Sequence, residues 1–96
     1  MVKLISIRSS KNPDKKWTAI FKLDSGKEKK VRFGQKGAPD YTIGASLTQR
    51  KSYRARHSVD NLHDPLSAGS LSYYILWGDS RNMNSNIQTY KRKFNI

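Results

Sequence analysis

Two histidines and two aspartates stand close together near the middle of the chain and form its densest group of possible metal ligands. They are His57, Asp60, His63 and Asp64, in the stretch HSVDNLHD. Zinc and nuclease sites use such groups, but this spacing matches no helical HExxH pair, and the chain has no cysteine. Asp64 directly precedes a proline, which is typical of a helix start. We therefore expect a surface loop here, with no metal and no cofactor.

Other catalytic patterns are also missing from the sequence. The serines lack a GxSxG motif, and the run from Gly34 to Gly37 resembles a phosphate loop without its GK[ST] ending. Glu28 is the single glutamate, and no carboxylates are paired for acid–base work. We expect a protein that is not an enzyme, with no catalytic residues.

The excess of basic residues is the strongest chemical signal. Nineteen Lys and Arg oppose seven Asp and Glu in 96 residues, giving a formal net charge of +12. Because such charge opposes compaction by self-repulsion, we expect a polyanion, an acidic protein surface or an anionic membrane as the partner. The candidate nucleic-acid-binding residues are Lys22, Lys27, Lys29, Lys30, Arg32, Lys36, Arg50, Lys51, Arg54, Arg56, Lys91, Arg92 and Lys93.

The first third of the chain predicts a β-meander that would display part of this charge. Residues 2–8 are rich in apolar and β-branched side chains, while residues 17–23 and 29–34 alternate between apolar and polar side chains. Turn residues separate the three segments, with Gly26 in the second connection. We predict an antiparallel sheet with one apolar face and one basic face, the basic face carrying Lys22, Lys30 and Arg32.

The remaining residues predict a loop and helices. Residues 37–45 form the loop, in which Tyr41 and Ile43 are expected to tuck under the sheet. Residues 46–58 predict a helix that is basic on a broad face and weakly apolar on the other. Tyr41, Tyr53 and Tyr73 are the candidate exposed aromatic platforms for bases.

The stretch DPLSAGSLSYYILWG, residues 64–78, contains no basic residue and predicts the central core helix. Asp64 would cap it, Pro65 would begin it and Gly78 would follow its end. Its apolar residues cover most of the circumference, so the helix must be buried, where an unpaired ammonium group would be very unfavourable.

The final segment, residues 79–96, predicts an amphipathic helix. Met83, Ile87, Tyr90 and Phe94 make its apolar stripe, and Asp79 or Ser80 would cap it. The cations Lys91 to Lys93 would fall in its last turn, where they suit the helix dipole.

Together these elements predict a single α+β domain over residues 1–96: a three-stranded antiparallel meander (1–36), a loop (37–45) and a helical part (46–96). The meander would pack against two to three C-terminal helices. No apolar run is long enough for a signal peptide or a membrane span, so we expect no transmembrane segment and no secretion.

Several motifs resemble a family of small basic proteins of unknown function from nucleocytoplasmic large DNA viruses, which include algal and giant viruses. The resemblance covers about residues 15–95. The matching residues are Phe33 and Gly34; Asp40, Tyr41 and Thr42; Tyr53, Arg54, Arg56 and His57; Asp64 to Trp77; and Tyr90 to Phe94. Residues 58–63 depart from the family, because SVDNLH replaces a more strongly charged stretch. The resemblance implies a viral setting, in the virion or in the host cytoplasm or nucleus, and no established activity.

Two functions remain open at this point. The first is a protein that binds the nucleic-acid backbone without sequence specificity, DNA in preference to RNA. Such a protein could be packaged in the virion. The second is a minor capsid or cement protein that contacts acidic capsid subunits. No RNA-binding or zinc-finger signature is present, and neither function requires a small-molecule substrate.

Overall fold

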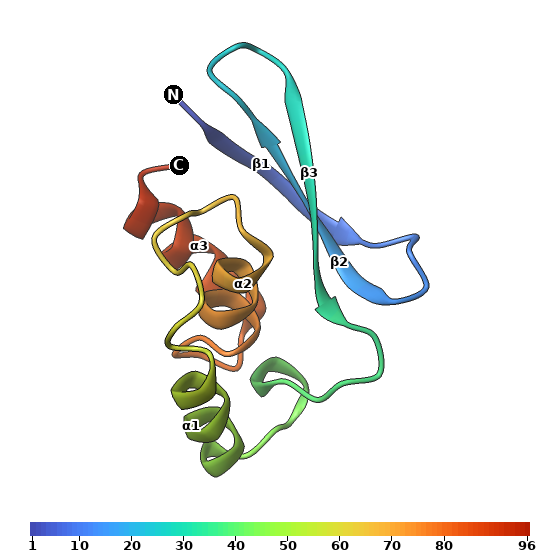
Figure 1. Ribbon diagram of the computed structural model, residues 1–96, viewed down its shortest axis with the longest axis vertical. Helices are drawn as coiled ribbons and strands as arrows, with labels where there is room; N and C mark the ends of the chain where they lie inside the picture. Colours follow the sequence, from blue (N-terminus) through green and yellow to red (C-terminus); the bar gives the residue numbers. More distant parts are fainter.

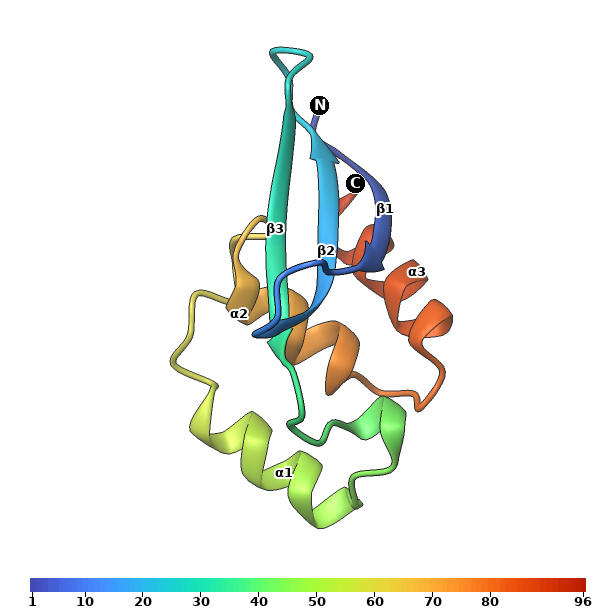
Figure 2. The same cartoon turned by 90° about the vertical axis from the view of Figure 1, so that its right-hand side faces the viewer.

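A computed structural model describes residues 1–96 as a three-stranded sheet with a layer of helices against one face (Figure 1). The helices lie on one side of the sheet, and the opposite side is uncovered (Figures 1 and 2). This arrangement confirms the predicted α+β fold. In chain order the elements are β1 (Lys3–Ser9), β2 (Lys15–Lys22), β3 (Glu28–Gln35), η1 (Tyr41–Ile43), α1 (Leu47–Arg56), α2 (Ala68–Leu71), η2 (Ser72–Leu76) and α3 (Met83–Phe94).

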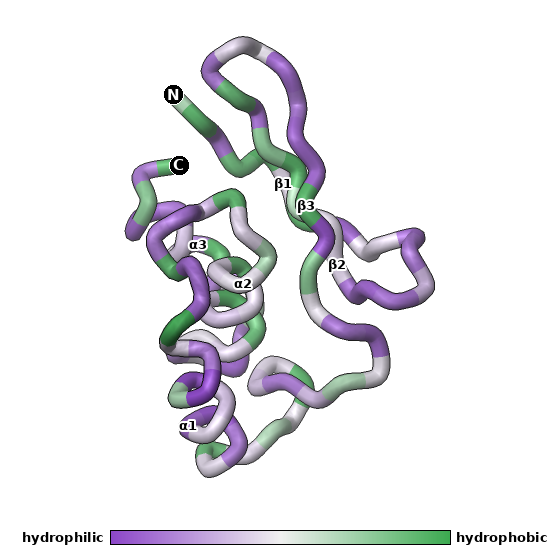
Figure 3. The backbone as a smooth tube through the Cα atoms, viewed as in Figure 1, coloured by the Kyte–Doolittle hydropathy of each residue, from purple (hydrophilic) through white to green (hydrophobic).

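The sheet is antiparallel with strand order β1-β2-β3, as the alternating pattern predicts. Ala19 and Phe21 of β2 and Phe33 of β3 point into the core and have no exposed surface. Because successive side chains in a strand point to opposite faces, their neighbours in sequence point outward. In Figure 3, β3 and the turn between β1 and β2 are mostly hydrophilic.

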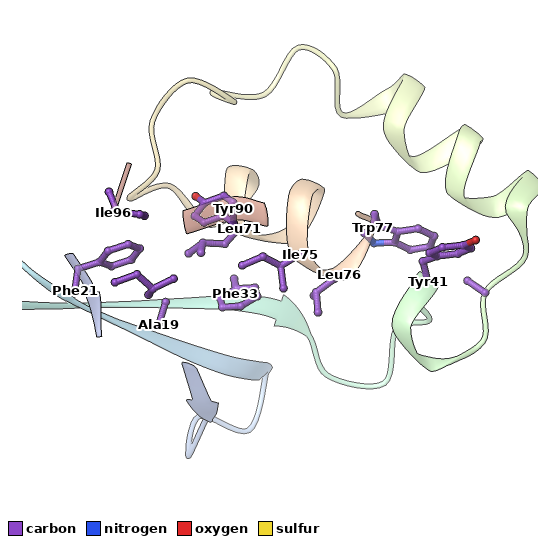
Figure 4. Close-up of a cluster of buried hydrophobic side chains, with 12 residues drawn as sticks. Ala19, Phe21, Phe33, Tyr41, Leu71, Ile75, Leu76, Trp77, Tyr90 and Ile96 are labelled. Atoms are coloured by element: carbon purple, nitrogen blue, oxygen red, sulfur yellow. The ribbon is translucent and has the colours of Figure 1, made fainter. Parts of the chain in front are cut away.

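The buried side chains form one cluster between the sheet and the helices (Figure 4). Leu71, Ile75 and Leu76 supply its helical side and meet Phe33 and Phe21 from the sheet. The stretch without basic residues therefore supplies the core helix, which runs through α2 and η2, as predicted from its composition.

The start of this core helix was predicted wrongly. Ser67 is the N-cap, and its hydroxyl accepts a hydrogen bond from the Ser70 N–H at 3.1 Å. Asp64 instead accepts from the Leu66 N–H in the preceding turn. Both residues suit an N-cap, and a proline directly after Asp64 fits a turn as well as a first helical turn.

The core helix also changes type along its length. After one turn of α-helix in α2, η2 is a π-helix, in which the Trp77 N–H bonds to the Ser72 carbonyl five residues back. Such turns are rare and occur frequently at functional sites.

The last helix has the predicted apolar stripe but a different cap. Asn82, and neither Asp79 nor Ser80, accepts from the Ser85 N–H at 3.0 Å. Tyr90 is the most deeply buried residue of the stripe, at 1% exposure. Beyond α3 the chain returns to the sheet, where the Leu4 N–H bonds to the Ile96 carbonyl.

Tyr41 is buried as predicted, but beside Trp77 of the helix layer and not under the sheet (Figure 4), and the prediction was wrong for Ile43, which is 67% exposed. The helix η1 holds both residues, so a single short turn points them in different directions. No helix in the protein is long and apolar enough to cross a membrane.

Candidate nucleic-acid interface

The uncovered face of the sheet carries a group of cations that we call the outer sheet face. Strand register places Thr18 between Arg8 and Arg32. Glu28 is the only acid on this face, and it lies opposite Lys22. All five cations are exposed. The members of the outer sheet face are Lys3, Arg8, Lys22, Lys30 and Arg32.

Three other predicted residues lie at the ends of the sheet. Lys27 is in the turn between β2 and β3. Lys29 pairs with Phe21, so its side chain leaves the sheet on the face opposite to Lys30. Lys36 follows β3, and its N–H bonds to the Asp14 carbonyl in the turn between β1 and β2. These residues extend the charge of the sheet without joining its outer rows.

Two arginines of α1 are engaged inside the helix layer. The Arg54 guanidinium donates to the Trp77 carbonyl at 2.8 Å and to the Tyr73 carbonyl at 3.3 Å. Arg50 donates to the Gly78 carbonyl and to Asp79, both at 2.8 Å. The two arginines thus satisfy carbonyls left free at the end of the core helix, where cations also suit the dipole.

The helix α1 has no fully buried side chain, and Leu47 is 57% exposed. The expected weakly apolar face is reduced to Tyr53, which is half-buried and packs against the core cluster. Of the predicted cations on this helix, Lys51 and Arg56 are exposed. Sequence reasoning missed a related residue, Arg81, which lies 4.2 Å from the Tyr41 ring centroid and donates to the Tyr41 carbonyl.

The three cations at the end of α3 belong to the helix layer, on the other side of the protein from the outer sheet face (Figures 1 and 2). Arg92 is exposed, and the Lys93 ammonium lies 5.0 Å from the Tyr74 ring centroid. Lys91 is half-buried. The predicted site residues therefore fall on two sides of the protein.

The histidine-rich stretch contains one close polar pair. His57 Nδ1 lies 2.8 Å from the Asp60 carboxylate, while His63 is exposed. No three His, Cys, Asp or Glu side chains come together as a possible metal site. The stretch contributes one wall residue, His57, to a neighbouring cavity.

This cavity, the α1 cleft, has a volume of about 510 Å³ and lies between α1, the chain after β3 and η2. Three stacked rings stand along it: Tyr53 lies 4.1 Å from His57 on one side and 4.4 Å from Trp77 on the other. Burial raises the pKa of the Tyr53 hydroxyl above its ordinary value of 10.0. The residues that line the α1 cleft are Lys16, Gly34, Gln35, Ala38, Pro39, Asp40, Thr48, Gln49, Ser52, Tyr53, Arg56, His57, Ser72, Leu76 and Trp77.

A buried ion pair fixes the loop beside the cleft. The Lys16 ammonium donates to Asp40 at 2.8 Å and to the Ala38 carbonyl, and Asp40 also accepts from the N–H and hydroxyl of Thr42. Gly34 makes the close approach of β3 possible. Its φ is +78°, and a Cβ there would lie 2.8 Å from Leu76.

The tyrosines are less available than the sequence suggested. Tyr41 is buried, Tyr53 is half-buried in the ring stack, and Tyr73 is half-buried with the Arg54 guanidinium 4.1 Å from its ring centroid. The expectation of freely exposed aromatic platforms was therefore wrong.

Fold and surface together define a small α+β protein with a basic sheet face. The chain belongs to a family of unknown function, DUF5754, whose model matches residues 5–57. A relative from Acanthamoeba polyphaga mimivirus, "Uncharacterized protein L851", is 36% identical over 80 residues, which cover 76% of this chain and 80% of that protein. These matches confirm the expected giant-virus family of unknown function. No solved structure matches the chain.

The family match covers the sheet, the loop and α1, and it ends at His57. It therefore includes every cation of the outer sheet face except Lys3, and the α1 side of the cleft, but it does not include the core-helix stretch, residues 64–78.

Proposed function

We propose that the protein binds nucleic acid, DNA in preference to RNA, through its outer sheet face, without sequence specificity and without catalysis. The observation that carries the proposal is the placement of five exposed cations and one acid on a single uncovered face. Salt-dependent release of counterions supplies the free energy of binding when such cations meet phosphates. The protein would act as a charge-neutralising partner of viral DNA, in the virion or at the place where DNA is packaged.

The chemistry of this face favours contacts with phosphate over contacts with bases. Between its cations stand Thr18 and Ile20, and the paired residues that point to this face include no aromatic ring and no side-chain amide. Base-specific recognition uses amide, guanidinium or carboxylate groups placed in a groove. A flat row of lysines and arginines holds the backbone and leaves the sequence unread.

The proposal is tested by the salt dependence of duplex DNA binding. Five phosphate contacts predict a slope of log K against log salt concentration of about −4.5. The double variant Lys30→Gln/Arg32→Gln should bind more weakly and reduce the magnitude of the slope by about 2. The matched control, Lys91→Gln/Arg92→Gln, removes the same charge from α3 and should leave both nearly unchanged.

Fluorescence anisotropy with duplexes of different sequence measures both the affinity for DNA and its dependence on salt concentration. If the sheet variant and the α3 control lose affinity equally, bulk charge is responsible and the outer sheet face is not the interface. Binding that does not change with salt would contradict the proposal altogether.

A second function, that of a minor capsid or cement protein, is favoured by one observation. The cations at the end of α3 lie on the side opposite to the outer sheet face, so two acidic partners could be held at once. Such a bridging protein should co-purify with capsid shells emptied of DNA. Lys91→Gln/Arg92→Gln should then release the protein from empty shells while DNA binding persists.

A further inference from the structure

The α1 cleft is the larger of the two main cavities of the protein, and binding of duplex DNA at the outer sheet face does not use it. Its volume of about 510 Å³ falls within the range of small-molecule sites. The π-helix η2 contributes Ser72 and Leu76 to its lining, and π-turns recur at functional sites. Cavity and irregular helix thus coincide at one place.

Neutral groups that both donate and accept hydrogen bonds dominate the polar lining. The amides of Gln35 and Gln49 and the hydroxyl of Ser52 line the cleft. The Gln49 oxygen already accepts from the Ser46 N–H, which leaves its NH₂ group free to donate. Nucleobase edges mix donors and acceptors in the same way, so these groups complement a base better than an apolar ligand.

The charges of the cleft suit one phosphate group. Asp40 is 2% exposed and already bonded to Lys16 and Thr42, so it offers little repulsion to an anion. Arg56 is the exposed cation of the lining and makes no hydrogen bond or ion pair within the protein. Guanidinium groups bind phosphate oxygens through paired N–H donors.

The ring stack gives the cleft a firm wall. Tyr53 and Trp77 are stacked with an interplanar angle of 9°, and His57 covers the other face of Tyr53. Trp77 joins this wall to the core beside Leu76, as Figure 4 shows. A wall that is ordered before binding reduces the entropy lost when a ligand enters.

We propose that the α1 cleft binds a nucleoside phosphate, with the base among the amide and hydroxyl groups and the phosphate on Arg56. The unit could be a free nucleotide or an unpaired nucleotide of a nucleic-acid strand. The second source rests on the proposed function and would add a single-strand site to the backbone contacts of the sheet.

The test uses the full chain and two pairs of matched variants. Amide chemical shifts are followed by NMR during titration with AMP, adenosine, inorganic phosphate and a short single-stranded oligonucleotide. Ser52→Phe fills the cleft, whereas Ala55→Phe adds the same bulk to an exposed position of α1 outside it. Arg56→Gln removes the cleft cation, whereas Lys51→Gln removes an exposed cation of the same helix.

AMP should shift resonances of the residues lining the cleft, and Ser52→Phe should abolish this binding while Ala55→Phe retains it. Arg56→Gln should weaken AMP binding about tenfold and leave adenosine binding unchanged. The control Lys51→Gln should leave AMP binding unchanged. If the oligonucleotide produces the same shifts and displaces AMP, the source is a nucleic-acid strand; if only AMP binds, the source is the free nucleotide.

Inorganic phosphate that binds as tightly as AMP would overturn the assignment of a base to the cleft. The proposal as a whole fails if neither AMP nor the oligonucleotide shifts cleft resonances, or if Ser52→Phe and Ala55→Phe behave alike. Duplex binding at the outer sheet face is measured on the same variants. Its persistence in Ser52→Phe separates failure of the cleft from failure of the proposed function.

Discussion

Replacing Lys16 by methionine should destabilise the protein strongly, because this ammonium group neutralises a buried carboxylate. Asp40 is 2% exposed and Lys16 15% exposed, with 2.8 Å between ammonium and carboxylate. Removing one partner of a buried pair costs about 3–5 kcal/mol. Thr42 still donates two hydrogen bonds to Asp40 in the variant, so we expect the lower end, about 3 kcal/mol.

A double-mutant cycle separates the ion pair from the packing of the two side chains. Asp40→Asn leaves an unpaired lysine that is partly able to reach water, so we expect a smaller loss of about 2 kcal/mol. The variant with both changes should be more stable than the sum of the single losses predicts, with a coupling of about 2 kcal/mol.

Thermal and urea unfolding measure these losses directly. A loss of 3 kcal/mol corresponds to a fall in Tm of roughly 12–24 °C in a domain of this size. Lys15→Met is the control, because Lys15 is half-buried but has no acidic partner, and its loss should stay within about 0.5 kcal/mol. The reasoning is refuted if Lys16→Met resembles Lys15→Met, or if the two single losses add without coupling.

Two further changes test the helix layer. Burial raises the pKa of Tyr90 above its ordinary value of 10.0, so the stability that its neutral form contributes is complete below pH 10 and is lost as the pH rises above it. Tyr90→Phe should lose about 1 kcal/mol at neutral pH with the hydrogen bond to the Pro65 carbonyl. It should also make the unfolding free energy fall less steeply with alkali in urea titrations; an unchanged alkaline slope would contradict the assignment. Gly78→Ala should destabilise by about 3 kcal/mol in the same assay, since a Cβ would lie 2.2 Å from the Tyr74 carbonyl oxygen. Gly69→Ala, whose nearest contact would be 3.4 Å, should change stability by less than about 1 kcal/mol, and equal losses at the two glycines would show that close contact is not the cause.

The sheet and the core helix were predictable because their signals are local. Alternation around Ala19 and Phe21 sets the buried face of β2, and the absence of basic residues from a mostly apolar stretch marks the core helix. The beginning of that helix was not predictable in the same way. Asp64 and Ser67 both have side chains that cap helices, and only the packed structure determines which of them does so.

The engaged arginines could not be identified from local sequence, because their partners are carbonyls far along the chain. Arg54 and Trp77 are separated by 23 positions. One signal was available nonetheless: α1 has no apolar stripe, and a helix without one must pack through polar groups. Arg50 and Arg54, at a spacing of four residues, share the face that would do so.

The cations of this protein thus divide into two groups with different physical roles, and net charge alone does not distinguish them. Arg50, Arg54 and Arg81 donate to backbone carbonyls within the helix layer. The lysines and arginines of the outer sheet face are exposed, and their side chains make no hydrogen bond or ion pair within the protein. Salt screens exposed charges over about 10 Å at 0.1 M and affects partly buried hydrogen bonds much less. Under the proposed function, rising salt should therefore release nucleic acid from the sheet well before it weakens the fold.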